Sequence, residues 1–159
     1  MNHAYEIPAR GQWLRLWSAL SARPLKVLAE GFAERYAAED LTLPQSGLGL
    51  LPLCDSALGD TYYLGELPLA QAHVRLHTED GQTVEGAATL MDDRAGLARA
   101  LAILDGVLAA RLPGHDQAAQ LLAEGAAVVA EQTRQRQALL AATRVDFSLL
   151  GSAGEDDDE

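Results

Sequence analysis

The feature that most constrains the fold is a regular alternation of side chains between residues 72 and 78. One set of alternate positions is mostly apolar and the other is polar: Ala72, Val74, Leu76 and Thr78 against His73, Arg75 and His77. A period of two is typical of a strand with one buried face. Asp80-Gly81 follows, and this dipeptide supplies the positive φ angles of a hairpin turn. We therefore expect a return strand over residues 84–90.

Two earlier segments also read as strands, but they are apolar on both faces. In 48–54, one face carries Leu48, Leu50 and Cys54, and the other carries Leu51 and Leu53. In 61–69, the corresponding sets are Tyr62 with Leu64, and Tyr63 with Leu67 and Leu69. Apolar residues on both faces indicate that both faces are covered. The cover is either the protein's own helices or another chain, and the sequence does not choose between them.

Helical periodicity flanks these strands on both sides. Apolar residues recur every three or four positions in 13–20, 25–36 and 97–112, and a long helix is expected from Asp116 to about Ala142. Its polar second half, 131–137, is expected to project from the core. The predicted class is α+β, with an antiparallel sheet of about four strands between two N-terminal and two C-terminal helices. We expect a flexible arm over 1–9, a single domain over 10–150 and a disordered acidic tail over 151–159.

Charge and cysteine content exclude several functions. The formal net charge is −11, which argues against binding a nucleic-acid backbone. The single cysteine, Cys54, rules out an intrachain disulfide and argues against a zinc or iron–sulfur site held by this chain alone. No stretch approaches the roughly 20 apolar residues of a membrane span, and no signal peptide is recognisable, so a cytoplasmic location is expected.

The candidates for chemistry each have a simpler interpretation. His73 and His77 share a strand face but lie about 13 Å apart, at about 3.3 Å per residue, which is too far for one zinc ion. They are better read as polar residues on an exposed or partner-facing strand. Cys54 is expected to be a small buried hydrophobe, because nothing local activates it. Asp92-Asp93 is read as a helix cap rather than a cation site. No catalytic, cofactor or metal residue is predicted.

The motif Thr143-Arg-Val-Asp-Phe147 is unusual, because it places an arginine, an acid and a large aromatic directly after a polar helix. Arg144 and Asp146 can form a buried charge pair, or Arg144 can hold a partner's carboxylate or phosphate in a fork. The simpler alternative is a helix-end anchor packed by Phe147. The functional interpretation of this motif is a subunit contact rather than catalysis.

Four stretches in order resemble the PhnG family, small subunits of the bacterial carbon–phosphorus lyase system. They are Arg10-Gly-Gln-Trp13, then Tyr63-Leu-Gly-Glu66 continuing through Ala72-His-Val-Arg-Leu76, then Asp80-Gly81 with Gly86 and the helix reaching Asp105, and finally Thr143 to Phe147. The resemblance spans about residues 10–150. It singles out these interface or motif residues: Arg10, Trp13, Gly65, Glu66, Arg75, Asp105, Arg144, Asp146 and Phe147.

The resemblance implies an accessory role. PhnG-like proteins act with PhnH, PhnI and PhnL to transfer the ribose triphosphate of ATP to methylphosphonate with release of adenine. They form a core with PhnH, PhnI and PhnJ, and PhnJ uses S-adenosylmethionine and an iron–sulfur cluster. This chain is expected to bind no cofactor itself, and whether it counts as an enzyme is left open.

Two departures and two alternatives accompany this expectation. The family commonly has Gly-Arg-Asp where this chain has Asp92-Asp93-Arg94, and the acidic tail is an addition. The first alternative is a stand-alone enzyme binding a small phosphorylated ligand at His73, Arg75 and His77. The second is a regulatory or scaffolding module in an unrelated pathway.

Overall fold

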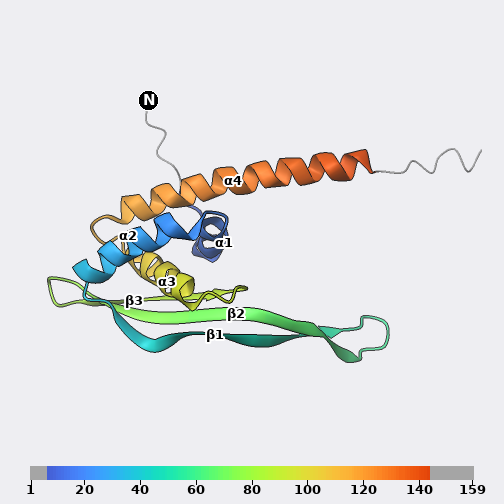
Figure 1. Cartoon of the computed structure of the whole chain (residues 1–159), viewed down its shortest axis with the longest axis horizontal. Coiled ribbons are helices and arrows are strands. Elements are labelled where there is room, and N and C mark those ends of the chain that lie inside the picture. Colours follow the sequence, from blue (N-terminus) through green and yellow to red (C-terminus); the bar gives the residue numbers. More distant parts are fainter. Residues whose placement is uncertain (1–6, 144–159) are drawn as a thin grey trace, which may run out of the picture.

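The structure is a computed structural model that describes residues 7–143. Its helices lie on one side of a three-stranded sheet (Figure 1). The elements in chain order are η1 (Arg10–Gln12), α1 (Trp13–Ser18), α2 (Ala22–Arg35), β1 (Glu39–Cys54), β2 (Thr61–His77), β3 (Thr83–Leu90), α3 (Ala95–Ala109) and α4 (His115–Ala142). The α+β class, with two N-terminal and two C-terminal helices, is confirmed.

The sheet is antiparallel with the order β1-β2-β3, so it has three strands rather than the predicted four. The predicted strand 61–69 and residues 72–77 of the next one belong to the single long strand β2, because Ala70 and Gln71 stay paired with both neighbouring strands. The residue pairs Ala70–Leu90 and His77–Thr83 mark the two ends of the β2–β3 ladder. Before Ala70, residues 61–69 of β2 pair with β1 alone, and the two strands form a long two-stranded hairpin (Figure 1).

The core lies between the sheet and helix α3. Alternate residues of β2, from Ala70 to Leu76, are buried against this helix, as the period of two predicts. Gly86 of β3 faces the helix at very close range, because a Cβ at this position would lie 2.1 Å from the carbonyl oxygen of Ala102. Strand and helix backbones therefore touch here, and α3 is buried along most of its length.

Helices α1, α2 and α4 complete the layer over α3. Trp17 is fully buried, and its indole N–H donates to the carbonyl oxygen of Ala118 in α4 at 3.2 Å. Gly125 lets α4 approach α1, since a Cβ there would lie 2.1 Å from the carbonyl oxygen of Leu16. The predicted projection of α4 is confirmed, because every residue from Glu131 onward in this helix is exposed. Figure 1 shows this half extending past the other helices.

The start of α3 differs from the prediction. Neither Asp92 nor Asp93 caps the helix, whose N-cap residue is Arg94 and has no side-chain cap hydrogen bond. Instead, the Asp92 carboxylate accepts hydrogen bonds from the backbone N–H of Arg94, at 2.8 Å, and from its guanidinium. The carboxylate thus stabilises a tight turn over Asp92–Arg94, directly before α3 begins at Ala95. Among the described helices, none is long and apolar enough to cross a membrane.

Candidate interaction surface

The outer part of the β1–β2 hairpin, residues 43–69, has no buried residue. We call this segment the outer hairpin. Most of it extends past α3 and the end of β3 (Figure 1). Its exposed large apolar side chains are Leu43, Leu48, Leu50, Leu51, Leu58, Tyr62, Tyr63, Leu64 and Leu69. Within residues 7–143, therefore, no helix buries this apolar segment, which favours the alternative of another chain.

A bulge in the outer hairpin redistributes its side chains between the two faces. The register shifts between Leu50, which pairs with Glu66, and Pro52, which pairs with Tyr63. The extra residue lies in β2, because Leu64 and Gly65 together lie opposite Leu51. Gly65 has a φ of 141°, a backbone conformation that glycine adopts more easily than other residues. The bulge reverses the alternation of β2, so Tyr63 shares a face with Leu50. The predicted grouping of Tyr63 with Leu67 and Leu69 is wrong for this reason.

Both faces of the outer hairpin are nevertheless apolar, as predicted. Leu48 and Leu50 lie on the face that carries the buried Ala70 further along the sheet. On the opposite face, Leu69 fills the space left by Gly49, because a Cβ on Gly49 would lie 2.5 Å from a Leu69 methyl group. Leu69 itself remains 38% exposed. Burial of both apolar faces of one thin hairpin requires cover from two sides.

Acidic residues are the only charged groups on the outer hairpin. They are Asp55 and Asp60 near the turn and Glu66 beside the bulge. None of the three forms an ion pair with another residue of the described chain. Cys54 lies at the same end and is exposed, which corrects the prediction of a buried cysteine. The prediction assumed that its strand was covered, and within this chain it is not.

The polar face of the inner sheet carries a network of opposite charges. Glu85 accepts hydrogen bonds from Arg75 at 2.9 Å and interacts with His73 at 3.1 Å, and Glu39 lies 3.3 Å from His77. The hydrogen bond from Arg75, followed by that from His73, lowers the pKa of Glu85. Two carboxylates thus already pair with Arg75, and each of the two histidines contacts one of them. The residues of the stand-alone enzyme hypothesis do not form a free cationic site for phosphate.

Two of the predicted motif residues, 95 positions apart, meet in one ion pair. The Arg10 guanidinium donates to both carboxylate oxygens of Asp105, at 2.9 and 2.6 Å, and Asp105 also accepts from the Ala87 N–H at 3.1 Å. The hydrogen bond to Asp105 raises the pKa of Arg10. Trp13 is buried, and its indole N–H donates to the carbonyl oxygen of Pro8 at 2.8 Å. In this chain these residues hold the turn around Pro8–Trp13 to the core.

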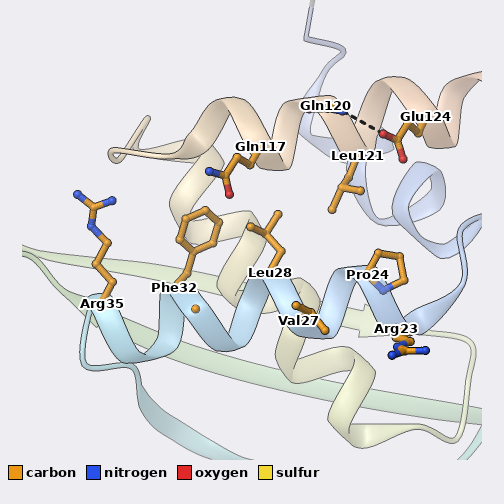
Figure 2. A pocket seen from close by; sticks show the side chains of 11 residues that line it. Arg23, Pro24, Val27, Leu28, Phe32, Arg35, Gln117, Gln120, Leu121 and Glu124 are labelled. Carbon is orange, nitrogen blue, oxygen red and sulfur yellow. Dashed lines mark hydrogen bonds between the residues drawn. The ribbon is translucent and has the colours of Figure 1, made fainter.

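A groove of about 720 Å³ runs between α2 and α4 (Figure 2). Its walls are mostly apolar, with Leu28 and Phe32 on one side and Leu121 on the other. Arg23 and Arg35 lie at opposite ends of α2 and do not converge on one point (Figure 2). The groove therefore has no pair of arginines directed at one point, as binding of a phosphorylated ligand would favour.

The remaining predicted residues fall into two groups. Gly65 and Glu66 lie in the outer hairpin and Arg75 in the inner network, so they do not form one site with Arg10 and Asp105. Arg144, Asp146 and Phe147 lie outside the described residues. Within residues 7–143, no group of three or more histidine, cysteine or acidic side chains is arranged to hold a metal ion.

Fold and surface together define an acidic α+β protein with a large uncovered apolar hairpin and no convergent catalytic set in its described part. The family described as "Phosphonate metabolism protein PhnG" matches residues 8–151. The chain therefore belongs to the PhnG family, as its motifs indicated. A search of curated proteins found no significant match.

Proposed function

We propose that this chain is an accessory subunit of a carbon–phosphorus lyase complex. Together with PhnH-, PhnI- and PhnL-like proteins, it is required for transfer of the ribose triphosphate of ATP to methylphosphonate with release of adenine. Membership of the PhnG family over residues 8–151 carries this proposal. The chain itself holds no cofactor in this proposal, and the S-adenosylmethionine and iron–sulfur cluster belong to a PhnJ-like partner.

The distribution of charge supports an accessory role. Stabilising a transferring triphosphate requires Lys, Arg or Mg²⁺ near its oxygens. The arginine of the inner sheet is already paired with Glu85 and Glu39, and the two arginines of the α2–α4 groove lie apart. An uncovered apolar hairpin supports a permanent contact instead, because obligate interfaces are more apolar than ordinary surface.

Reconstitution by omission tests the proposal. The purified chain alone should release no adenine from ATP and methylphosphonate. The mixture of PhnH-, PhnI- and PhnL-like proteins should do so only when this chain is added. Adenine release by the pure chain, lost in His77→Ala, would instead support the stand-alone enzyme. Full activity without this chain would favour a scaffolding module of another pathway.

The C-terminal motif has a separate test within the same proposal. Arg144→Ala and Asp146→Ala should each weaken assembly with the partner subunits more than they lower the thermal unfolding temperature. If both variants assemble normally, the motif is not a subunit contact. Deletion of 151–159 serves as the control and should leave the activity of the complex unchanged.

A further inference from the structure

The outer hairpin differs from an ordinary exposed strand pair in having no predominantly polar face, because large apolar side chains are exposed on both of its faces. Leu50 and Tyr63 are 59% and 63% exposed on one face, while Tyr62 and Leu69 are exposed on the other. A strand pair that rests on a flat partner surface would need only one apolar face. Apolar residues on both faces fit a hairpin inserted into a groove.

The edges of the outer hairpin are not suited to pairing with a further strand. Pro44 and Pro52 lie in β1, and Pro68 lies in β2 beyond the end of the β2–β3 ladder. Proline has no backbone N–H, so each one removes a donor that an added strand would need. Binding through side chains of the two faces is therefore favoured over extension of the sheet.

The charge of the hairpin argues against a second copy of this chain as the occupant. Two outer hairpins in contact would bring Asp55, Asp60 and Glu66 of both copies together, and each whole chain already carries a net charge of −11. Like charges at an interface cost free energy, whereas complementary charges speed association and fix register. A basic rim on a different protein is the complement of this surface.

From these features we infer that the outer hairpin is the docking element of this subunit. It inserts between apolar walls of a different polypeptide, whose rim carries lysine or arginine side chains facing Asp60 and Glu66. The inference rests on the proposed function, since the occupant is one of the partner subunits of the complex. It adds the contact surface and the chemistry of the partner's site.

Truncation of the apolar faces is the first test. Full-length wild-type chain and the double variant Leu50→Ser/Tyr63→Ser are each added to the co-expressed PhnH-, PhnI- and PhnJ-like subunits, and assembly is measured by titration. The variant should bind at least about tenfold more weakly, because two large central anchors are lost. Val27→Ser/Met91→Ser is the matched control, since these side chains are similarly exposed, at 62% and 71%, but lie outside the hairpin.

Reversal of charge is the second test. Asp60→Lys/Glu66→Lys should slow association by about threefold to tenfold at low salt and weaken its dependence on ionic strength. Asp93→Lys/Glu131→Lys changes the net charge equally at sites away from the hairpin and is the control. A rate lowered equally by both double variants would reflect overall charge alone and overturn the inference of a basic rim.

The outcomes separate the two proposals. If wild-type chain fails to join the partner subunits, the proposed function fails. If wild type assembles and the Leu50→Ser/Tyr63→Ser variant assembles equally well, the function stands and the docking inference is overturned. Circular dichroism and thermal unfolding should show that both serine variants remain folded. A wild-type dimer in sedimentation that this variant converts to monomer would assign the hairpin to a second copy and also overturn the inference.

Discussion

At the scale of single residues, Asp105 shows how a motif residue can be structural. It is the buried charged residue of the described core, and it lies in the middle of an apolar helix. An unpaired carboxylate would be costly there. Arg10 and the Ala87 N–H satisfy both of its oxygens, which ties the N-terminal turn and β3 to the same side chain.

Removal of the cation should therefore destabilise the fold. Arg10→Ala is expected to lower the free energy of unfolding by about 1–3 kcal/mol, the usual cost of leaving a buried hydrogen-bonding group unsatisfied. Denaturant titration of both proteins measures this. Arg15→Ala, an exposed arginine of the neighbouring helix, should change the value by less than about 0.5 kcal/mol. Equal values for the two variants would mean that the pair contributes nothing.

The turn before α3 predicts a pH dependence. Hydrogen bonds from the Arg94 side chain lower the pKa of Asp92 from 3.8 to about 2. A lowered pKa in the folded state stabilises the protein above pH 3.8, and this contribution is lost as the pH falls toward 2. Asp92→Asn should lower the free energy of unfolding by about 0.2–1 kcal/mol at pH 6, because the pair is exposed to solvent.

The difference between wild type and Asp92→Asn should shrink between pH 4 and pH 2. Denaturant unfolding at several pH values measures it. The neighbouring substitution Asp93→Asn removes a carboxylate that makes none of these hydrogen bonds, so it should show no comparable loss. A difference that stays constant down to about pH 2 would contradict this account of the turn.

At the scale of elements, β3 and α3 pack with their backbones in direct contact. Gly86 faces Gly106, and a Cβ on Gly86 would lie 2.1 Å from the Ala102 carbonyl oxygen and 2.6 Å from the Gly106 nitrogen. Both of these atoms belong to the backbone, so neither can move as a side chain would. The distance between sheet and helix thus depends on the absence of a side chain at one strand position.

Gly86→Ala should lower the free energy of unfolding by about 3 kcal/mol or more, at the upper end of the cost of overpacking. Gly47→Ala is the matched control in the same sheet, because nothing lies within 4 Å of a Cβ at that position. Thermal and denaturant unfolding of both variants test the comparison. Similar stability of the two would show that β3 can move away from α3 at little cost.

At the scale of the whole molecule, the described chain divides into two parts of different stability. The inner sheet is buried against α3, whereas residues 47–69 lie past the end of the β2–β3 ladder and none of residues 43–69 is buried. A two-stranded hairpin with little burial is marginal in water. The outer hairpin should therefore open more readily than the rest of the fold.

Hydrogen exchange should reveal this division. Amides of residues 43–69 are expected to exchange at least about tenfold faster than those of β2 between Ala70 and Leu76, because they lack buried neighbours. Addition of the partner subunits should slow exchange in the outer hairpin, while α3 changes little. Uniform protection along both strands of the free chain would contradict the two-part description.

The sequence by itself determined the local structure. The period of two over 72–78 and the Asp80-Gly81 turn placed the β2–β3 hairpin, and the helical repeats placed α2, α3 and α4, because neighbours on one element share a face at a fixed spacing. The motifs also led to the PhnG family. These signals depend on residues near one another in the chain.

Only the tertiary structure decided what covers each face. It joined two predicted strands into β2, moved Tyr63 to the other face through the bulge at Gly65, left Cys54 exposed and brought Arg10 to Asp105. Apolar character on both faces of the outer hairpin was visible in the sequence, but whether helices lie over it was not. Burial depends on which distant elements pack together, and periodicity carries no information about them.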